Sequence, residues 1–224
     1  MTAPIVQSPS PVTLVGGGDC PPEDLAQALK RAPRLVAADG GAGVALAAGH
    51  APEAVIGDLD SLDPADRDRL PPGRLFPIRE QDSTDFDKAL RSVRAPLVLA
   101  VGFLGARIDH QLAALNVLVR RADRRCILIG GHEAIFHCPP RLALDLAPGD
   151  RLSLFPMAPL RGRSRGLEWP IDGLDLAPDG RIGTSNRALG PVALEPGAPG
   201  LLVLVPRRRL DAAIRALASA PASG

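Results

Sequence analysis

The chain has 224 residues, of which 46% are hydrophobic, so it is long enough for one large domain or two small ones with a buried core. Its 26 Lys and Arg residues and 25 Asp and Glu residues give a formal net charge of +1, which argues against nucleic acid as a partner. Three cysteines without a Cys-x-x-Cys pair argue against both a disulfide framework and a structural zinc site.

The N-terminal residues 1–11 have neither a basic start nor an apolar core, so we expect no signal peptide. No apolar run approaches the roughly 20 residues that a membrane-spanning helix requires. We therefore expect a cytoplasmic protein with no membrane partner.

Short apolar runs alternate with helical patterns from Val12 to Ile129. The strands expected from these runs are Val12–Val15, Leu35–Ala38, Ala54–Ile56, Leu75–Ile78, Leu97–Val101 and Cys126–Ile129. Continuous apolar runs are typical of parallel strands that are covered on both faces. The alternation of strands and helices predicts an α/β domain with a doubly wound parallel sheet, which we place at residues 1–130.

Three helices between these strands have recognisable signals. Pro22 is expected at the first position of one helix, and Thr84 is expected to cap another. The buried stripe of a third helix is predicted to contain Ile108, Leu112, Leu115 and either Leu118 or Val119.

After Gly130 the helical period disappears until Leu210, and short runs are divided by Pro and Gly. The strands expected here are Ala134–His137, Leu142–Leu146, Arg151–Phe155, Gly166–Trp169, Pro191–Leu194 and Leu201–Val205. This pattern predicts a small antiparallel β-sandwich domain at residues 131–224, with a final helix over 207–218.

Four clusters of acidic residues each follow an expected strand of the first domain. Their members are Asp39; Asp58 and Asp60; Asp82, Asp85 and Asp87; and Asp109. The carboxyl ends of strands in an open α/β sheet converge on one crevice, where carboxylates repel each other unless a cation lies among them. Hard oxygen ligands suit Mg²⁺, so the clusters predict Mg²⁺-assisted chemistry on a phosphate ester.

The two aspartates of Gly-Asp-Leu-Asp-Ser are two residues apart. In extended chain Asp58 and Asp60 project to the same side and can face one cation, although a surface turn would also tolerate them. Asp39 precedes Gly40 and Gly41, which would let a ligand approach the backbone closely. Alternatively, Asp39 only caps the next helix.

Two further pairs combine an acid with a cation. Asp82 precedes a helix that carries Lys88 one turn later, which suits a metal-bound phosphate chain, although acids at a helix start are also ordinary. Arg107 lies two residues before Asp109, and its guanidinium can hold phosphate oxygens through two hydrogen bonds.

Three other features have a structural and a functional interpretation. Glycines 16–18 after the first strand are either a phosphate-binding turn without the full Gly-x-Gly-x-x-Gly spacing or an ordinary turn. The arginine-rich segment 161–165 is interpreted as a solvated loop. Trp169, the only tryptophan, is either a core residue of the sandwich or partly exposed beside a turn.

Taken in order, the motifs resemble those of the thiamine pyrophosphokinase (thiamine diphosphokinase) family, from about Leu14 to Val205. The segments that carry the resemblance are 38–42 (ADGGA), 56–61 (IGDLDS), 82–90 (DSTDFDKAL), 105–113 (GARIDHQLA), 166–170 (GLEWP) and 183–186 (GTSN). The family often has Asn where Ala114 stands and Lys where Glu168 stands, but no carboxylate of the motifs is missing.

The resemblance implies an α/β catalytic domain followed by a β-sandwich, and a homodimer with active sites shared between subunits. The implied reaction transfers pyrophosphate from ATP to the hydroxyl of thiamine, with Mg²⁺, and yields thiamine diphosphate and AMP. The resemblance assigns catalysis to Asp58, Asp60, Asp82, Asp85 and Asp109, of which the first three are also metal ligands. It assigns ATP binding to Asp39, Gly40, Gly41, Lys88 and Arg107. It assigns thiamine binding to Trp169, Ser185 and Asn186.

Two alternatives to this function remain at the level of sequence. One is a Mg²⁺-dependent nucleotide hydrolase, in which water replaces thiamine. The other is a non-catalytic sensor of thiamine or nucleotide, for which so many carboxylates are hard to explain. The sequence leaves open which of Asp82, Asp85 and Asp109 accepts the proton of the attacking alcohol.

Overall fold

A computed structural model describes residues 3–105 and 107–221, which form two compact units. The first unit runs up to Val117 and also includes Leu128–Gly130. The second comprises Leu118–Ile127 and the chain from Gly131 onward. None of the described helices is both long and apolar enough to cross a membrane.

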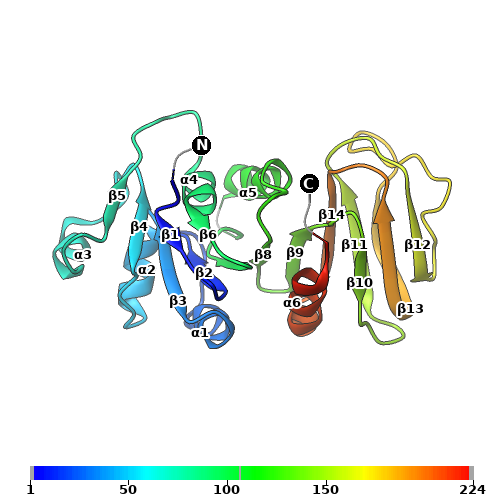
Figure 1. The fold of residues 1–224 in the computed structure, drawn as a ribbon, viewed down its shortest axis with the longest axis horizontal. Helices are drawn as coiled ribbons and strands as arrows, with labels where there is room; N and C mark the ends of the chain where they lie inside the picture. The colour runs from blue at the N-terminus through cyan, green and yellow to red at the C-terminus, as the bar shows by residue number, and fades with distance from the viewer. Residues whose placement is uncertain (1–2, 106, 222–224) are drawn as a thin grey trace. The chain divides into compact units, whose positions relative to one another are not determined.

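Helices and strands alternate in the first part of the chain, and strands predominate in the second (Figure 1). The helices are α1 (Pro22–Arg31), α2 (Gly41–Ala47), α3 (Pro64–Arg69), α4 (Asp85–Ser92), α5 (Ile108–Arg120), the 3₁₀ helix η1 (Arg207–Arg209) and α6 (Leu210–Ser219). The strands are β1 (Val6–Gln7), β2 (Val12–Val15), β3 (Arg34–Ala38), β4 (Ala54–Gly57), β5 (Leu75–Pro77), β6 (Val93–Arg94), β7 (Val98–Val101), β8 (Cys126–Ile129), β9 (Glu133–His137), β10 (Leu142–Leu144), β11 (Arg151–Pro156), β12 (Gly162–Leu167), β13 (Gly183–Pro196) and β14 (Leu201–Pro206).

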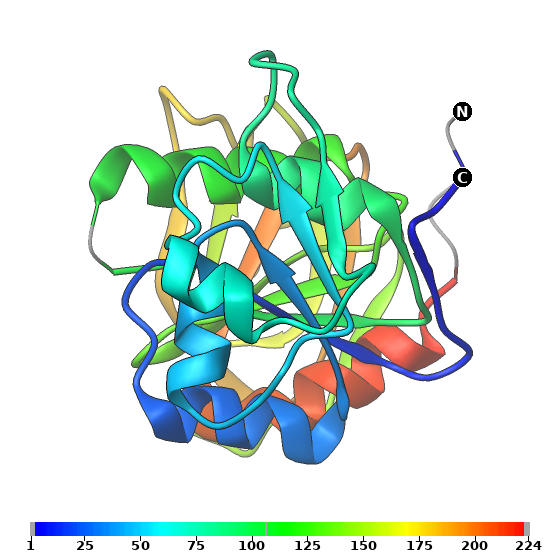
Figure 2. The ribbon, with the colours of Figure 1, turned by 90° about the vertical axis from the view of Figure 1, so that its left-hand side faces the viewer.

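A parallel sheet with the order β7-β2-β3-β4-β5 organises the first unit. In its centre Leu14 pairs with Val36 on one side and with Ala100 on the other, and all three are buried. Helices α1 and α2 lie on one side of this sheet and α4 lies on the other (Figures 1 and 2). Coverage of both faces explains why these strands are continuous apolar runs.

Helix starts in the first unit follow their sequence signals. Pro22 is the first residue of α1, as predicted. Thr84 caps α4, because its hydroxyl accepts a hydrogen bond from the Asp87 amide at 3.3 Å. The carboxylate of Asp63 caps α3 in the same way, through the Ala65 amide at 2.8 Å. These caps fix where the chain leaves the loops that carry the acidic residues.

The glycines after β2, β3 and β7 allow one backbone to approach another. A Cβ atom on Gly41 would lie 2.2 Å from the Val15 carbonyl oxygen, and one on Gly16 would lie 2.6 Å from the Gly102 carbonyl oxygen. Neither position can hold a side chain without moving a strand. Backbone packing therefore accounts for these two glycines, and it draws the carboxyl ends of neighbouring strands together.

The predicted buried stripe of α5 is wrong at Ile108 and Leu112 but right at Leu118, and Leu115 is partly buried. Ile108 is 75% exposed and Leu112 is 59% exposed, whereas Ala114, Val117 and Leu118 are buried. The helix has more apolar residues than one buried face can hold, so apolar spacing alone did not identify the face that packs. The exposed pair lies one turn apart on the same face.

Antiparallel pairing organises the second unit, with the strand order β10-β13-β11-β14-β9. Strand β13 is 14 residues long and pairs differently along its length. Its first part pairs with β11, and its last part lies between β10 and β12. Helix α6 packs against β10 and β14.

Two sequence predictions for the second unit are wrong in their bounds. The arginine-rich segment is mostly strand β12 and not a loop, and β12 ends at Leu167, before Trp169. Gly166 was expected to start a strand but lies at an irregularity inside β12, with φ of 77°. A Cβ atom there would be 2.2 Å from the Pro191 carbonyl oxygen, so Gly166 allows two strands to approach closely.

An ion cluster around Asp150 ties β11 to η1. The buried carboxylate accepts a hydrogen bond from the Ala147 amide at 2.8 Å and pairs with Arg208 at 2.7 Å and Arg209 at 2.6 Å. Burial alone would raise the pKa of Asp150, but the Ala147 amide and the two arginines outweigh it and hold the pKa below its ordinary value.

We expect Asp150→Asn to lower the free energy of unfolding by about 1–2 kcal/mol at pH 7, because the charged partner of two arginines is lost. Because the pKa of Asp150 is lower in the folded state, its ionised form stabilises the fold fully above the unfolded-state pKa of about 3.9. This stabilisation is lost as the pH falls through the folded-state pKa. Urea unfolding at pH 7 and at pH 3.5 should therefore show a difference from wild type that narrows in acid. Asp145→Asn is the control, since that side chain is 82% exposed.

Candidate active site

Three carboxylates of the first unit lie together at the carboxyl ends of two adjacent strands. Asp39 follows β3, and Asp58 and Asp60 follow β4; one carboxylate oxygen from each lies within 4.8 Å of the others. Asp39 is buried, Asp58 is partly exposed and Asp60 is exposed. We call these three residues the acidic group.

Asp39 has one oxygen satisfied and one free. Its Oδ2 accepts a hydrogen bond from the Ser61 amide at 3.2 Å, whereas its buried Oδ1 has no hydrogen-bond partner. Burial raises the pKa of Asp39 to about 6; the Ser61 hydrogen bond lowers it, and the charges of Asp85 and Asp58 raise it further. A buried carboxylate oxygen without a partner can accept a bond from a cation or a donor.

Lys88 provides a cation beside the acidic group. It is 1% exposed, and its Nζ lies 2.7 Å from Asp58 Oδ2 and 3.0 Å from Asp85 Oδ1. Burial alone would lower the pKa of Lys88, but the hydrogen bonds to Asp58 and Asp85 outweigh it and raise the pKa. The hydrogen bond from Lys88 is in turn the main reason that the pKa of Asp58 is lowered. Lys88 therefore keeps Asp58 ionised.

The acidic group fits a Mg²⁺ ion. The three oxygens lie within 4.8 Å of one another, so small side-chain movements would bring them to the distance of about 4.2 Å or less that separates oxygens around an octahedral Mg²⁺. The free Oδ1 of buried Asp39 is the acceptor that such an ion would satisfy. Carboxylate oxygens are also the donor type that Mg²⁺ prefers.

Asp82 lies outside the acidic group. It is exposed on the loop before α4, and this loop is held by Glu80, which accepts hydrogen bonds from Ser83 at 2.5 Å and Arg91 at 2.7 Å. The predicted metal ligands were Asp58, Asp60 and Asp82, whereas the structure groups Asp39 with Asp58 and Asp60. Metal ligation by Asp82 stays a prediction.

Arg107 and Asp109 form an ion pair at 2.5 Å, with 66% and 63% of their side chains exposed. The hydrogen bond between them raises the pKa of Arg107 and lowers the pKa of Asp109. Asp109 is not a member of the acidic group. The roles of both residues toward phosphate stay predictions, as do those of Gly40 and Gly41 beside Asp39.

The predicted thiamine-binding residues lie together in the second unit. Trp169 is 53% exposed, so the core interpretation of this residue is wrong. The buried side-chain amide of Asn186 donates to the Trp169 carbonyl at 2.7 Å. Ser185 is exposed, with φ of 59°, and its amide donates to the Ser153 hydroxyl at 3.0 Å.

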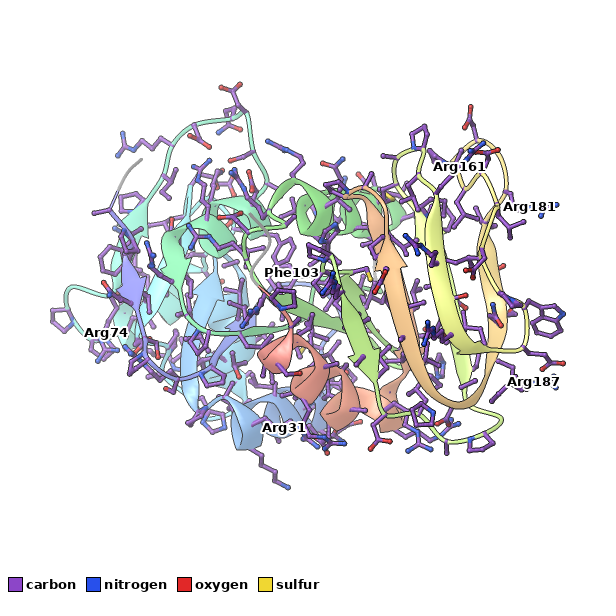
Figure 3. The ribbon with its side chains drawn as sticks, turned by 45° about the vertical axis from the view of Figure 1, so that its right-hand side comes forward. Arg31, Arg74, Phe103, Arg161, Arg181 and Arg187 are labelled. Carbon is purple, nitrogen blue, oxygen red and sulfur yellow. The ribbon has the colours of Figure 1, made fainter. Side chains whose placement is uncertain are left out.

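Sequence reasoning missed one residue beside Trp169. The Arg187 guanidinium carbon lies 5.8 Å from the centroid of the indole, over the ring. Arg187 directly follows the Gly183–Asn186 motif, and it lies at the edge of the second unit (Figure 3). Position next to the motif was the only sequence signal for it.

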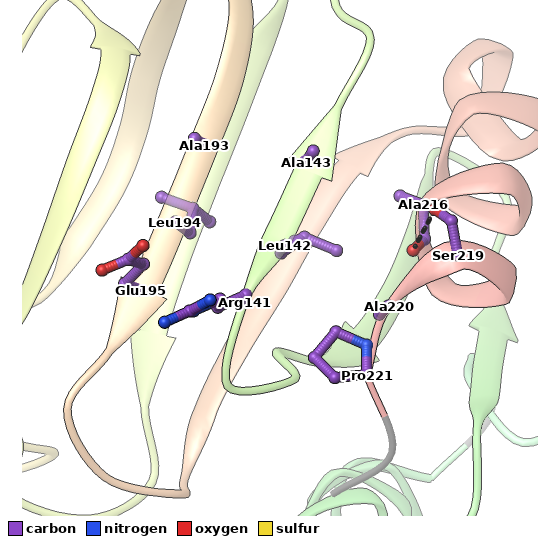
Figure 4. Close-up of a pocket in the computed structure, with 10 residues that line it drawn as sticks. All are labelled: Arg141, Leu142, Ala143, Ala193, Leu194, Glu195, Ala216, Ser219, Ala220 and Pro221. Carbon is purple, nitrogen blue, oxygen red and sulfur yellow. Dashed lines mark hydrogen bonds between the residues drawn. The ribbon is translucent and has the colours of Figure 1, made fainter.

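A groove of about 280 Å³ in the second unit contains none of the predicted site residues (Figure 4). Its walls come from β10, β13 and the end of α6, and they are mostly apolar, with Arg141 and Glu195 as the charged residues. The described residues that line the groove do not include a set of polar side chains that point to one place, which a ligand site would require.

Most of the first unit matches a known protein family. Residues 25–129 match the family model described as "Thiamin pyrophosphokinase, catalytic domain". The acidic group and Lys88 lie within this match. The matched segment also contains Asp82, Asp85, Arg107 and Asp109.

Curated relatives include thiamine pyrophosphokinase 1 of Oryza sativa subsp. japonica and thiamine pyrophosphokinase 1 of Arabidopsis thaliana. Each is 28% identical over 156 residues, or 61% of this chain. The match covers 59% of the rice protein and 58% of the Arabidopsis protein. The chain thus spans about three-fifths of the length of these relatives.

Solved structures share the fold. Thiamin pyrophosphokinase from Candida albicans aligns with a TM-score of 0.76 and 15% identity over 91% of this chain and 92% of that one. The enzyme from Geobacillus thermodenitrificans aligns with a TM-score of 0.70 and 21% identity over 88% and 96%. The mixed α/β architecture with a large, mostly parallel sheet is therefore shared with these proteins. Together with the match of residues 25–129 to the family model, this confirms the resemblance to thiamin pyrophosphokinases that was inferred from the motifs.

Proposed function

We propose that the protein is a thiamine diphosphokinase, which transfers pyrophosphate from ATP to the hydroxyl of thiamine and releases AMP. The observation that carries the proposal is the acidic group with the free, buried Oδ1 of Asp39, within a segment that matches the family's catalytic domain. A site that only recognises thiamine would not need to bury an unsatisfied carboxylate.

Mg²⁺, bound to Asp39, Asp58 and Asp60, would offset negative charge on the phosphate oxygens and orient the triphosphate. Lys88 holds Asp58 in its ionised form and orients it through a 2.7 Å hydrogen bond. The loop of Asp82, anchored by Glu80 and Arg91, would present a further carboxylate to the phosphate chain. Asp82, Asp85 and Asp109 remain the alternatives for accepting the proton of the attacking hydroxyl.

We further propose a division of labour between the units. The first, as a doubly wound parallel-sheet domain, would bind ATP and Mg²⁺; the second, as a small β-sandwich, would bind thiamine. The exposed indole of Trp169 supports the second assignment, because an aromatic face attracts both a flat aminopyrimidine and a cationic thiazolium. A location in the cytoplasm, without nucleic-acid or membrane partners, stays a prediction from the sequence.

A homodimer with shared active sites is part of the same proposal. Exposed Ile108 and Leu112 on α5 support it, because two large apolar side chains on one exposed helix face favour burial against another surface. We expect light scattering to give the mass of two chains. Ile108→Gln with Leu112→Gln should shift that mass toward one chain, and a wild-type monomer at assay concentration would rule the dimer out.

Incubation with ATP and Mg²⁺, with and without thiamine, tests the function. AMP and thiamine diphosphate formed only when thiamine is present support the kinase. AMP formed equally without thiamine would instead support the nucleotide hydrolase. Saturable ligand binding without any turnover would support the sensor.

A further inference from the structure

The backbone at Trp169 is held by a buried amide. Asn186 Oδ1 accepts hydrogen bonds from the Trp169 amide at 3.3 Å and from the Arg187 amide at 2.8 Å, while its Nδ2 donates to the Trp169 carbonyl at 2.7 Å. Three of the bonds that this side chain can make are thus used within the protein. Asn186 is 5% exposed, so water does not compete with the protein for these hydrogen bonds.

The Arg187 guanidinium lies over one face of the Trp169 indole. The guanidinium carbon is 5.8 Å from the ring centroid, in the range of a cation–π contact. More than half of the Trp169 side chain is nevertheless exposed to solvent. We expect the face opposite the guanidinium to be the one that a ligand can reach.

Glu168 anchors the guanidinium and offsets its charge. Arg187 Nη1 lies 3.1 Å from Glu168 Oε2, and the Glu168 amide donates to the Arg187 carbonyl at 2.9 Å. An unpaired guanidinium beside the indole would repel a cationic ligand on the other face. Because Arg187 is paired with Glu168, it repels a cation on the other face of the indole only weakly.

We propose that Asn186 and Arg187 are positioning residues that hold Trp169 as a preformed, one-sided platform for a flat, cationic heteroaromatic ring. The inference rests on the proposed function for the identity of that ring. It gives Asn186 a different role from direct contact with thiamine, since its buried amide already serves the backbone of Trp169. Preorganisation reduces the entropy that ligand binding must remove from the indole.

The single tryptophan and the absence of tyrosine make Trp169 directly observable by fluorescence. We expect Arg187→Gln to increase the local motion of the indole in time-resolved anisotropy, and its quenching by acrylamide, in the protein without ligands. Asn186→Asp should do the same, because a carboxylate oxygen would face the Trp169 carbonyl. Arg181→Gln is the matched control, since it removes the same charge from an exposed arginine of the same unit.

Thiamine titration without ATP, read by the same fluorescence, gives the second result. Arg187→Gln should raise the Kd for thiamine about three- to fivefold, the range of one partly exposed cation–π contact, with the ATP KM unchanged. Wild-type indole motion in Arg187→Gln would overturn the proposal even if Asn186→Asp fails to fold. Greater motion with an unchanged thiamine Kd would also overturn it. Greater motion in a protein whose wild type binds no thiamine would uphold the positioning role and contradict the proposed function.

Discussion

Asp60→Asn should reduce turnover by about 100- to 1,000-fold while leaving the fold intact. The substitution removes one charge from the acidic group without disturbing the pair between Lys88 and Asp58. Metal-directed charge stabilisation is worth several kcal/mol, and each 1.36 kcal/mol changes a rate about tenfold. Asp60 is exposed, so its own contribution to stability is small. Steady-state kinetics at saturating Mg²⁺ measure the loss.

The control for this change is Asp68→Asn, which neutralises an exposed aspartate on α3 in the same unit. Calorimetric titration with Mg²⁺ separates a metal ligand from a residue that acts only in turnover, because a lost ligand weakens metal binding as well. Near-wild-type turnover in Asp60→Asn would remove this residue from the metal site. Equal losses in both variants would indicate a general effect of charge.

Lys88→Met should lower the free energy of unfolding by about 2–4 kcal/mol. Removal of the buried ammonium leaves Asp58 and Asp85 without their shared partner, and breaking a buried ion pair costs about 3–5 kcal/mol. We reduce that figure because 35% of the Asp85 side chain is exposed, so water solvates part of the charge. For a chain of this size the expected fall in Tm is about 5–15 °C.

Mg²⁺ should restore part of this loss. A divalent cation in the acidic group would supply positive charge beside Asp58, so we expect Mg²⁺ to raise the Tm of Lys88→Met more than that of wild type. Thermal melts in EDTA and in Mg²⁺ measure both effects. Lys30→Met is the matched control, since Lys30 is the only other lysine and is exposed. An unchanged Tm in EDTA would show that the buried ion pair does not stabilise the fold.

Local sequence determined most of the first unit. The strand bounds of β2 and β8 agree with their apolar runs, and the start of α1 and the Thr84 cap of α4 follow signals within one or two turns of chain. Asp58 and Asp60 lie close together as expected, but not for the expected reason: they follow the end of β4, and Leu59 between them has φ of 66°, so a turn and not extended chain brings them together. These features depend on neighbours in sequence, so a single chain contains the information.

Long-range packing decided the rest. Which face of α5 is buried, and that Gly166 lies inside β12, depend on surfaces that approach from distant parts of the sequence. The placement of Asp39 with Asp58 and Asp60 depends on β3 pairing with β4, and the burial of Lys88 depends on the packing of α4 on these strands. Arg187 meets Trp169 because β13 returns beside the end of β12. Sequence alone thus determined the residue types and their local spacing, whereas only the tertiary structure decided which charges and rings meet, because burial and pairing energies arise between segments far apart in the chain.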